Sequence, residues 1–270
     1  MGKRLNVKQI LCLQWLGVKA SEIFRANENF FNNIAKERDD LEELLNKAKS
    51  RIKEQERLGI CSFPFHHPDF PQCLRVIGED CPLLIHLLGN MDLLDRKAVA
   101  IIGARKAGEK GCYIAYNCAV ECAKNGEVVI SGMALGCDTA AHQGCLSVNG
   151  KTIAIVASGL DITHPKENKP LQDRILQNEG LLLSEQVIGL KANPTRLIAR
   201  NRLQAALCQK LIVAECPIHS GTMHTVRFAQ KYEKKIYAGQ FTHYNQGNSG
   251  NEYLLTLIPQ HYYKLNFLST

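Results

Sequence analysis

Two glycine-containing turns, each following an apolar run, are the places in this sequence where binding chemistry is most readily expected. The first is residues 100–105, Ala-Ile-Ile-Gly-Ala-Arg, and the second is residues 131–138, Ser-Gly-Met-Ala-Leu-Gly-Cys-Asp. A continuous apolar run is typical of a buried parallel strand, and a glycine at its end lets the backbone approach a ligand closely. The helix that follows presents free N–H groups and a partial positive charge. Together the turns predict a phosphate site, with these candidate residues: Gly103, Arg105, Ser131 and Gly132.

Three later segments also carry residues suited to binding phosphate. Lys166 stands in a loop after the strand expected at 152–157. Residues 200–202, Arg-Asn-Arg, are expected to open a helix, where the dipole disfavours cations, so a bound anion would remove the conflict. Residues 220–222, Ser-Gly-Thr, combine hydroxyl groups with a helix start after the strand expected at 210–214. The candidates added are Lys166, Arg200, Asn201, Arg202, Ser220, Gly221 and Thr222.

Other reactive side chains give weaker signals. Asp138 and His142 are four residues apart, a spacing compatible with acid–base or metal chemistry, but we expect Asp138 to cap the helix and His142 to be an ordinary histidine on its face. Glu185 and Glu215 follow strands and are expected to pair with the arginines. The chain has no Gly-x-Gly-x-x-Gly fingerprint, Walker A motif or Cys-x-x-Cys pair, which disfavours classical NAD binding, P-loop ATP hydrolysis and zinc-ribbon sites. We predict no catalytic residue, no metal and no cofactor.

Strand-like and helix-like patterns alternate from residue 97 onward. Such alternation with short connections predicts an α/β fold, an extended Rossmann-like parallel sheet with helices on both faces, whose ligand binds at the carboxyl ends of the strands. The expected strands are 98–102, 127–131, 152–157, 180–184, 210–214 and 235–238. The expected helices are 110–124, 138–148, 168–178, 201–208 and 222–233.

The first third of the chain has a different character. Residues 5–57 show helical spacing of apolar side chains, interrupted by a turn at 16–21, and predict a small N-terminal helical domain over 1–57. This domain is either a simple cap or a SAM-like or helix–hairpin–helix-like module that contacts DNA or protein. Prolines and glycines in 58–90 predict extended chain and turns that lead into a second domain, 58–270, with its motif core at 97–251.

Composition sets the cellular context that we expect. The 270-residue chain carries a formal charge of +7, which permits a polyanionic partner without requiring one. Its 11 cysteines are odd in number and scattered, which argues against a disulfide framework and for a reducing compartment. No signal peptide opens the chain and no apolar run approaches the length of a membrane span, so a cytoplasmic protein without membrane association is expected.

In their order and spacing, these motifs resemble the DprA/Smf family of DNA-processing proteins. The resemblance implies an extended Rossmann domain that binds single-stranded DNA in a basic pocket, forms a homodimer, protects incoming DNA in natural transformation and loads a RecA-type recombinase. The phosphate-facing residues that it implies are Gly103, Arg105, Lys166, Arg200, Arg202 and residues 220–222. The matching segments are 100–105, 131–138, 140–144, 150–154, 159–161, 165–168, 183–185, 200–202, 220–222 and 247–251.

The chain departs from the family pattern at several positions. The family usually has serine where Ala104 stands and arginine where Leu135 stands, and the second change removes one phosphate contact. The Phe-Pro that commonly precedes Arg-Asn-Arg is replaced around Leu197 and Ile198. Because the sequence stops soon after Asn251, we expect no C-terminal winged-helix domain.

Two other functions remain open. A nucleotide hydrolase of the related lysine-decarboxylase-like group needs a glutamate soon after its glycine-threonine turn, whereas Thr222 is followed by Met, His, Thr and Val. A nucleotide-binding Rossmann sensor that signals through the N-terminal helices also fits the motifs.

For the DNA-binding function we expect weak sequence preference and strong salt dependence. The expected dimer interface is the apolar stretch 222–237.

Overall fold

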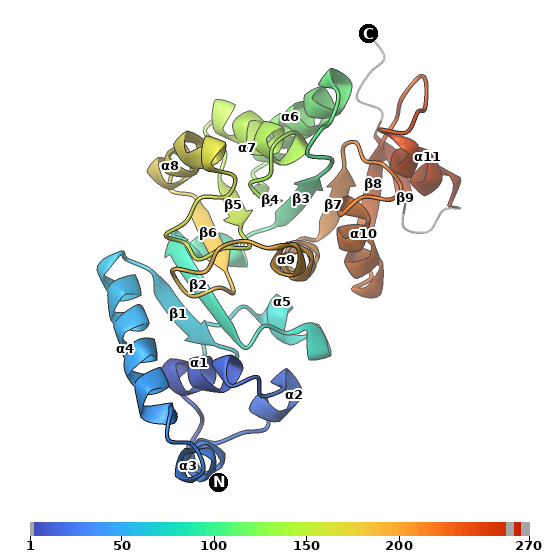
Figure 1. The fold of residues 1–270 in the computed structure, drawn as a ribbon. Coiled ribbons are helices and arrows are strands. Elements are labelled where there is room, and N and C mark those ends of the chain that lie inside the picture. Colours follow the sequence, from blue (N-terminus) through green and yellow to red (C-terminus); the bar gives the residue numbers. More distant parts are fainter. Residues whose placement is uncertain (1–2, 258–261, 266–270) are drawn as a thin grey trace.

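A single mixed sheet forms the centre of the molecule. The structure, a computed structural model, describes residues 3–257 and 262–265. Within these residues the strands follow the order β1-β2-β6-β5-β4-β3-β7-β8-β9 (Figure 1). All neighbouring pairs from β6 to β9 are parallel, whereas β1 and β2 add an antiparallel edge. The α/β, Rossmann-like fold expected from the sequence is therefore confirmed, with an antiparallel addition at one edge.

The sequence patterns located the six central strands, β3 to β8, within two residues of their observed bounds. Strands β1 and β2 lie in the proline-rich segment that was expected to hold only extended chain and turns, and β9 was not expected at all. The short β1 ends in a proline, a residue found mainly at sheet edges. The strands are β1 Cys61–Pro64, β2 Leu84–Gly89, β3 Ala98–Ile102, β4 Val128–Ser131, β5 Thr152–Ile155, β6 Leu181–Ser184, β7 Lys210–Val213, β8 Lys235–Gly239 and β9 Tyr262–Leu265.

Helices cover both faces of the sheet, because alternate residues of each strand point to opposite sides. In β3, Val99 and Ile101 pack among the side chains of α6 and α7, whereas Ala100 and Ile102 pack with those of α9 and α10. The α-helices are α1 Val7–Trp15, α2 Ala20–Ile23, α3 Glu28–Lys36, α4 Leu41–Arg57, α5 Gln72–Arg75, α6 Glu109–Lys124, α7 Cys137–Ser147, α8 Lys169–Gln177, α9 Pro194–Leu207, α10 Thr222–Lys231 and α11 Ser249–Thr256. Short 3-10 turns lie at Gly78–Asp80, Met91–Asp95 and Lys166–Asn168.

Helix α9 begins seven residues earlier than the sequence predicted. The Asn193 side chain caps it by accepting a hydrogen bond from the backbone N–H of Arg196 at 2.8 Å, and Pro194 occupies the first turn. Residues 200–202 therefore lie in the interior of the helix. The prediction that these arginines stand at a helix N-terminus and need an anion there is therefore wrong.

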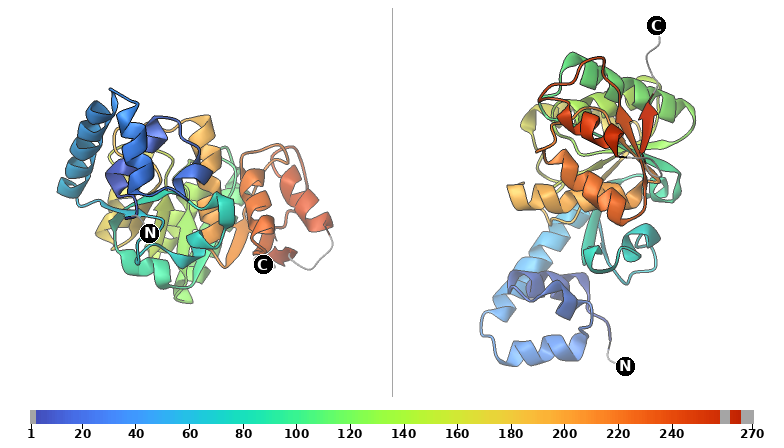
Figure 2. Two further views of the ribbon diagram at one scale, coloured as in Figure 1. Left: turned by 90° about the horizontal axis from the view of Figure 1, so that it is seen from below. Right: turned by 90° about the vertical axis from the view of Figure 1, so that its right-hand side faces the viewer.

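The N-terminal helices α1 to α4 project from the edge of the sheet that carries β1 and β2 (Figure 2). Their buried side chains, such as Ile10 and Ile52, belong to one apolar cluster with Leu182 of β6 and Ile175 of α8. The division of the chain into two domains at residue 57 stays a prediction. None of the helices in the described ranges combines the length and the apolar character that a bilayer span requires.

A buried polar cluster also ties α4 to the sheet. The side-chain oxygen of Gln55, Oε1, accepts a hydrogen bond from the backbone N–H of Ile188 at 3.0 Å. The side-chain nitrogen, Nε2, therefore donates to Ser62 Oγ at 2.7 Å and to His86 Nδ1 at 3.0 Å. His86 Nδ1 therefore acts as an acceptor, which leaves the proton on Nε2. Burial lowers the pKa of His86 from 6.5 to about 4. The cluster thus holds α4 against β2 through a neutral histidine.

Candidate functional site

A cavity of about 510 Å³ lies at the carboxyl ends of the central strands, between the turn after β3 and helices α9 and α10. This is where ligands of open α/β sheets bind. The cavity brings together most of the residues that the sequence singled out for binding phosphate. The predicted residues that line it are Gly103, Arg105, Arg200, Asn201, Ser220, Gly221 and Thr222.

Close backbone packing holds the turn after β3 in place. Ala104 donates its backbone N–H to the carbonyl oxygen of Glu215 at 2.7 Å, and the Thr222 hydroxyl donates to the carbonyl oxygen of Gly103 at 3.0 Å. A Cβ atom at Gly103 would overlap the side chain of Cys137. The turn is therefore fixed between β7 and the start of α10, and only a residue without a side chain fits at position 103.

The N-terminus of α6, where a Rossmann fold usually receives phosphate, is already occupied. A carboxylate oxygen of Glu215 accepts the backbone N–H of Gly108, the residue that caps α6, at 3.0 Å. The same carboxylate lies so close to Gly111 that a Cβ there would overlap it. Glu215 therefore caps α6 rather than pairing with an arginine as the sequence suggested, and the phosphate site cannot lie at this helix end.

Arg200 forms the floor of the cavity and is almost completely buried. Its Nη1 donates to the carbonyl oxygen of Gly132 at 2.7 Å and to that of Ile155. Its Nε has no hydrogen-bond partner among the described residues. Burial lowers the pKa of Arg200, opposed by the nearby Asp138 and reinforced by Arg105. A buried guanidinium with an unused donor is a strong indication of an anionic ligand.

Asp138 lies beside Arg200 and does not cap its helix, contrary to the prediction. Gly136 occupies the cap position of α7, and Asp138 sits within the first turn, where its carboxylate accepts the backbone N–H of Ala134 at 3.2 Å. Burial raises the pKa of Asp138, an effect that Arg200 opposes. Asp138 is the sole carboxylate among the residues that line the cavity.

The start of α10 supplies a second buried donor. The Ser220 hydroxyl oxygen is buried, and the Cys216 thiol, a weak acceptor, is the side-chain group beside it among the described residues. Asn201 donates its side-chain amide to the carbonyl oxygen of Gly221 at 3.1 Å, which fixes this turn against α9. Ser220 and Arg200 therefore face the same cavity, each with hydrogen-bonding capacity that a ligand oxygen would use.

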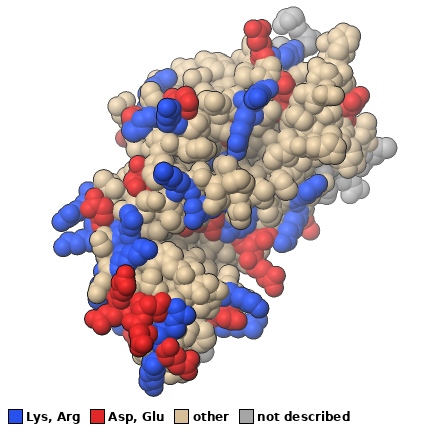
Figure 3. Space-filling model, in the orientation of Figure 1, with Lys and Arg blue, Asp and Glu red and all other residues tan. Residues whose placement is uncertain are grey.

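Exposed cations and apolar side chains complete the rim. Arg105 and Lys106 line the cavity, are exposed and form no ion pair within residues 3–257. Pro194, Leu197 and Ile198 of α9 form an apolar wall, and Ile198 remains 41% exposed. Figure 3 shows lysine and arginine side chains spaced across this face, while acidic side chains gather over the N-terminal helices. A cationic rim beside an apolar wall suits a ligand with phosphate groups and bases.

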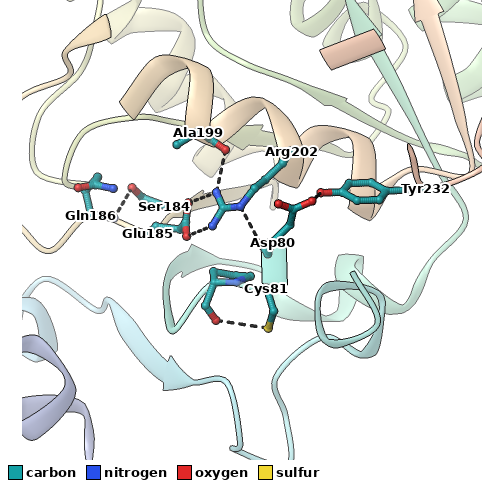
Figure 4. A network of polar contacts seen from close by, with 9 residues as sticks. Asp80, Cys81, Ser184, Glu185, Gln186, Ala199, Arg202 and Tyr232 are labelled. Atoms are coloured by element: carbon teal, nitrogen blue, oxygen red, sulfur yellow. Dashed lines mark hydrogen bonds and ion pairs between the residues drawn. The ribbon is translucent and has the colours of Figure 1, made fainter. Parts of the chain in front are cut away.

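Arg202, predicted to contact phosphate, is not among the residues that line the cavity, and Figure 4 shows it within a separate network of polar contacts. Its guanidinium forms a two-point ion pair with the Glu185 carboxylate, with both N–O distances at 2.5 Å. Its Nε donates to the carbonyl oxygen of Asp80 at 2.7 Å. The Asp80 side chain in turn accepts from Lys231 and from the Tyr232 hydroxyl. The pairing of Glu185 with an arginine is confirmed, and a phosphate contact by Arg202 would require this ion pair to open.

The remaining predicted residues support the cavity from behind or lie beyond it. Ser131 is buried and donates its hydroxyl to the carbonyl oxygen of Ile101 at 2.7 Å. Gly132 lies directly beneath the Arg200 guanidinium. Lys166 is exposed and does not line the cavity, although Asn168 ties its loop to the second turn by donating to the carbonyl oxygen of Met133 at 2.7 Å. Their direct phosphate contacts stay predictions.

Sequence reasoning missed two features of the site. Leu197 and Ile198 were noted only as departures from a family pattern, although their apolar character next to two arginines was a usable signal. The capping role of Glu215 had no local signal, because its partner Gly108 is 107 residues away in the chain. In the described residues no group of His, Cys, Asp or Glu side chains could hold a metal ion, and every cysteine is free.

Replacing Gly132 by alanine should destabilise the protein, whereas the same change at Gly221 should leave the free energy of unfolding unchanged. A Cβ at Gly132 would overlap the guanidinium of Arg200 and approach Asp138 Oδ2 to 2.6 Å, while a Cβ at Gly221 would meet no atom within 4 Å. We expect Gly132→Ala to lower the free energy of unfolding by about 1–3 kcal/mol and to weaken ligand binding. Urea unfolding and binding measurements on both variants test this, and equal behaviour of the two would contradict the geometry.

Comparison with known proteins identifies similar sequences. The family model described as DNA recombination-mediator protein A matches residues 62–264. DNA processing protein DprA of Streptococcus pneumoniae is 40% identical over 159 residues, which are 59% of this chain and 56% of that protein. Protein Smf of Synechocystis sp. is 34% identical over 175 residues, 63% of this chain and 44% of that protein. The chain thus spans about half the length of these curated relatives.

Two solved structures share the fold. The X-ray structure of DNA processing protein A from Streptococcus pneumoniae has a TM-score of 0.72 and 31% identity, covering 93% of this chain and 88% of the other. A structure that concerns the single-stranded DNA binding mode of DNA processing protein A from Helicobacter pylori has a TM-score of 0.65 and 32% identity, covering 73% and 87%.

Proposed function

The chain belongs to the DNA recombination-mediator protein A family, and from that premise we propose that it binds single-stranded DNA through the cavity between α9 and α10. The DNA backbone would enter along the exposed side chains of Arg105 and Lys106. One phosphate would sit above Arg200, within reach of Ser220. The family resemblance read from the motifs is thereby confirmed, while the ligand and the residues that bind it are our proposal.

One observation carries the proposal. Arg200 and Ser220 both line the cavity, and among the described residues the buried Arg200 Nε has no hydrogen-bond partner, while the buried Ser220 hydroxyl has only the weakly accepting Cys216 thiol beside it. Buried polar groups are rarely left unsatisfied, because each costs free energy on folding. A phosphate offers several acceptor oxygens and a negative charge, so it would satisfy both atoms and neutralise the buried guanidinium.

The lining of the cavity favours binding of a DNA strand of any sequence over recognition of particular bases. Its polar groups face a phosphate, whereas Pro194, Leu197 and Ile198 offer only apolar contact to bases. Apolar and stacking contacts do not distinguish one base from another. We therefore expect binding with weak sequence preference and with the salt dependence of phosphate contacts.

The wider role follows from the family resemblance. We propose that the protein is not an enzyme, that it protects incoming DNA in natural transformation and loads a RecA-type recombinase, and that it acts as a homodimer in the cytoplasm. The expected dimer interface at 222–237 needs revision, because Val226, Ala229 and Ile236 of this stretch are buried in the core of the subunit itself. An interface formed by α10 would use its exposed polar side chains.

The two alternative functions gain less support from the site. A nucleotide pyrophosphate bound in the Rossmann manner would need the N-terminus of α6, which the Glu215 carboxylate already caps. A hydrolase would need a free carboxylate near the ligand, yet Asp138 is held by Ala134 and lies beside Arg200. Both observations favour a binding function for this cavity.

Fluorescence anisotropy with labelled poly-dT tests the proposal. Arg105 is exposed and unpaired, so Arg105→Ala should leave the unfolding curve unchanged while weakening binding roughly tenfold, about 1.4 kcal/mol. The dependence of log affinity on log salt should become shallower by about 0.7 for each lost phosphate contact. Arg174→Ala, which removes an exposed arginine of α8 outside the cavity, is the matched control. Binding that ignores salt, or equal affinity of Arg105→Ala and wild type, would refute the proposed site.

A further inference from the structure

A second cavity, of about 530 Å³, lies between the N-terminal helices and the segment that follows β1. It shares no lining residue with the cavity between α9 and α10. Residues 4–25 supply one wall and residues 65–81 the other. The residues that matter for its chemistry are Arg4, Phe24, Arg25, Phe65, His66 and Arg75.

This cavity carries uncompensated positive charge. The Arg4 and Arg25 side chains are exposed and form no hydrogen bond or ion pair within residues 3–257. Glu79 is the one acidic residue among those lining the cavity, and it likewise forms no ion pair in that range. Arg75 is held at the wall by the backbone, since its Nε donates to the carbonyl oxygen of Phe65 at 3.2 Å. Arg75 also donates to the carbonyl oxygens of His67 and Pro68, so the free positive charge of this cavity is that of Arg4 and Arg25, beside a single carboxylate.

The pKa of His66 is affected by the same positive charges. Its pKa is lowered first by burial and then by the charges of Arg4, His67 and Arg75. Its Nδ1 is buried and has no hydrogen-bond partner among the described residues. A neutral imidazole with an unused ring nitrogen can donate to or accept from the edge of a base.

Aromatic rings complete the lining. The rings of Phe24 and Phe65 meet edge to face with centroids 4.7 Å apart, and Phe65 meets the His66 ring in the same way at 5.0 Å. Such rings offer flat apolar surface to a planar ligand. A volume of about 530 Å³ lies within the range of pockets that hold small molecules. An inorganic anion would use the arginines but not the rings.

We infer that this cavity is a second nucleotide site, in which Arg4 and Arg25 bind a phosphate group and Phe24, Phe65 and His66 contact a base. Cation and aromatic side chains in one recess are the combination that nucleotides require. The nucleotide is either free in solution or part of a DNA strand, and in the second case the inference rests on the proposed function. Because the two walls come from different segments, the bound nucleotide would join the N-terminal helices to the α/β sheet.

Isothermal titration with thymidine monophosphate and anisotropy with short and long poly-dT test the inference together. The site variant is Arg4→Ala/Arg25→Ala, which removes two exposed, unpaired side chains and should unfold like wild type. Arg174→Ala is the matched control for charge, and Arg105→Ala reports on the other cavity. If the site takes a free nucleotide, the double variant should bind thymidine monophosphate at least tenfold more weakly, while Arg105→Ala and Arg174→Ala bind it normally.

If the site binds a nucleotide that belongs to a DNA strand, the double variant should bind long poly-dT roughly tenfold more weakly than wild type. It should bind short poly-dT as tightly as wild type. The inference is overturned if the double variant matches wild type for both ligands, or if thymidine monophosphate binding depends on Arg105 and not on Arg4 and Arg25. Thymidine monophosphate binding through Arg4 and Arg25, without poly-dT binding by wild type, would refute the proposed function and leave this second site standing.

Discussion

Replacing Arg200 by alanine is expected to lower the free energy of unfolding by about 3–5 kcal/mol and to abolish detectable binding of single-stranded DNA. The substitution removes the donor to the carbonyl oxygens of Gly132 and Ile155. It also leaves the buried Asp138 carboxylate without the positive charge that opposes the rise of its pKa. Urea unfolding followed by circular dichroism measures the first effect, and anisotropy with poly-dT measures the second.

A double variant separates the structural effect from the binding effect. Arg200→Met/Asp138→Asn removes both charges while keeping similar side-chain volume, so it should recover most of the lost stability. It should still fail to bind DNA, because the guanidinium that would hold the phosphate is absent. Normal DNA binding by the double variant would show that Arg200 only supports the cavity and does not contact the ligand.

Acidification is expected to destabilise the protein steeply from about pH 6.5, the ordinary histidine pKa, down to about pH 4 for His86 and about pH 3 for His142. Burial lowers the pKa of His86 to about 4 and that of His142 to about 3. The unfolded chain takes up these protons below its own pKa, whereas the folded chain does not, so stability is complete above that value and falls as the pH falls. Each histidine should account for on the order of 3–5 kcal/mol.

Burial keeps both rings neutral, and for His142 the hydrogen bonds show which ring nitrogen carries the proton. Thr152 donates its hydroxyl to the carbonyl oxygen of Val129 at 2.7 Å, so it can only accept from His142 Nδ1, 2.8 Å away. His142 Nε2 is then an unprotonated, buried nitrogen without a partner among the described residues. The raised pKa of Asp138 acts in the opposite direction, since it adds stability as the pH falls through its folded value.

Urea midpoints measured across this pH interval test the prediction, with His86→Gln and His142→Gln as the variants. Each variant should lose part of the pH dependence, because glutamine keeps an amide donor but does not titrate. The control His243→Gln, which changes an exposed histidine outside both buried clusters, should retain the wild-type profile. A midpoint in wild type that does not change between about pH 6.5 and pH 4 would contradict the buried, neutral state of both rings.

The parts of the fold that depend on local pattern were predictable from the sequence. Strands β3 to β8 are short apolar runs flanked by turn residues, so their positions and their shared carboxyl edge followed from periodicity. The turns at Gly103 and at residues 220–222 were each expected at this edge, and the structure places both in one cavity. What periodicity shows is which residues reach the same edge of the sheet.

The partners of the charged residues were not predictable in this way. The sequence predicted that Glu185 pairs with an arginine, but it did not specify that the partner is Arg202, 17 residues away, because that depends on how α9 packs against the sheet. Arg200 and Arg202 differ by two positions and hence lie on nearly opposite sides of α9. Arg200 therefore reaches the cavity, and Arg202 reaches the network around Asp80. The sequence analysis did not separate the two arginines, because it placed both at a helix N-terminus.

The carboxylate of Glu215 at the start of α6 has a consequence for competition inside a cell. A group tethered to its partner by the fold is present at an effective concentration of the millimolar order or above, and it cannot diffuse away. Free nucleotides would have to displace it to occupy that helix end, and they would gain little, because one carboxylate is exchanged for another anion. If the protein binds DNA as proposed, Glu215 would therefore reduce competition from free nucleotides at this helix end without opposing a strand that contacts the neighbouring turns.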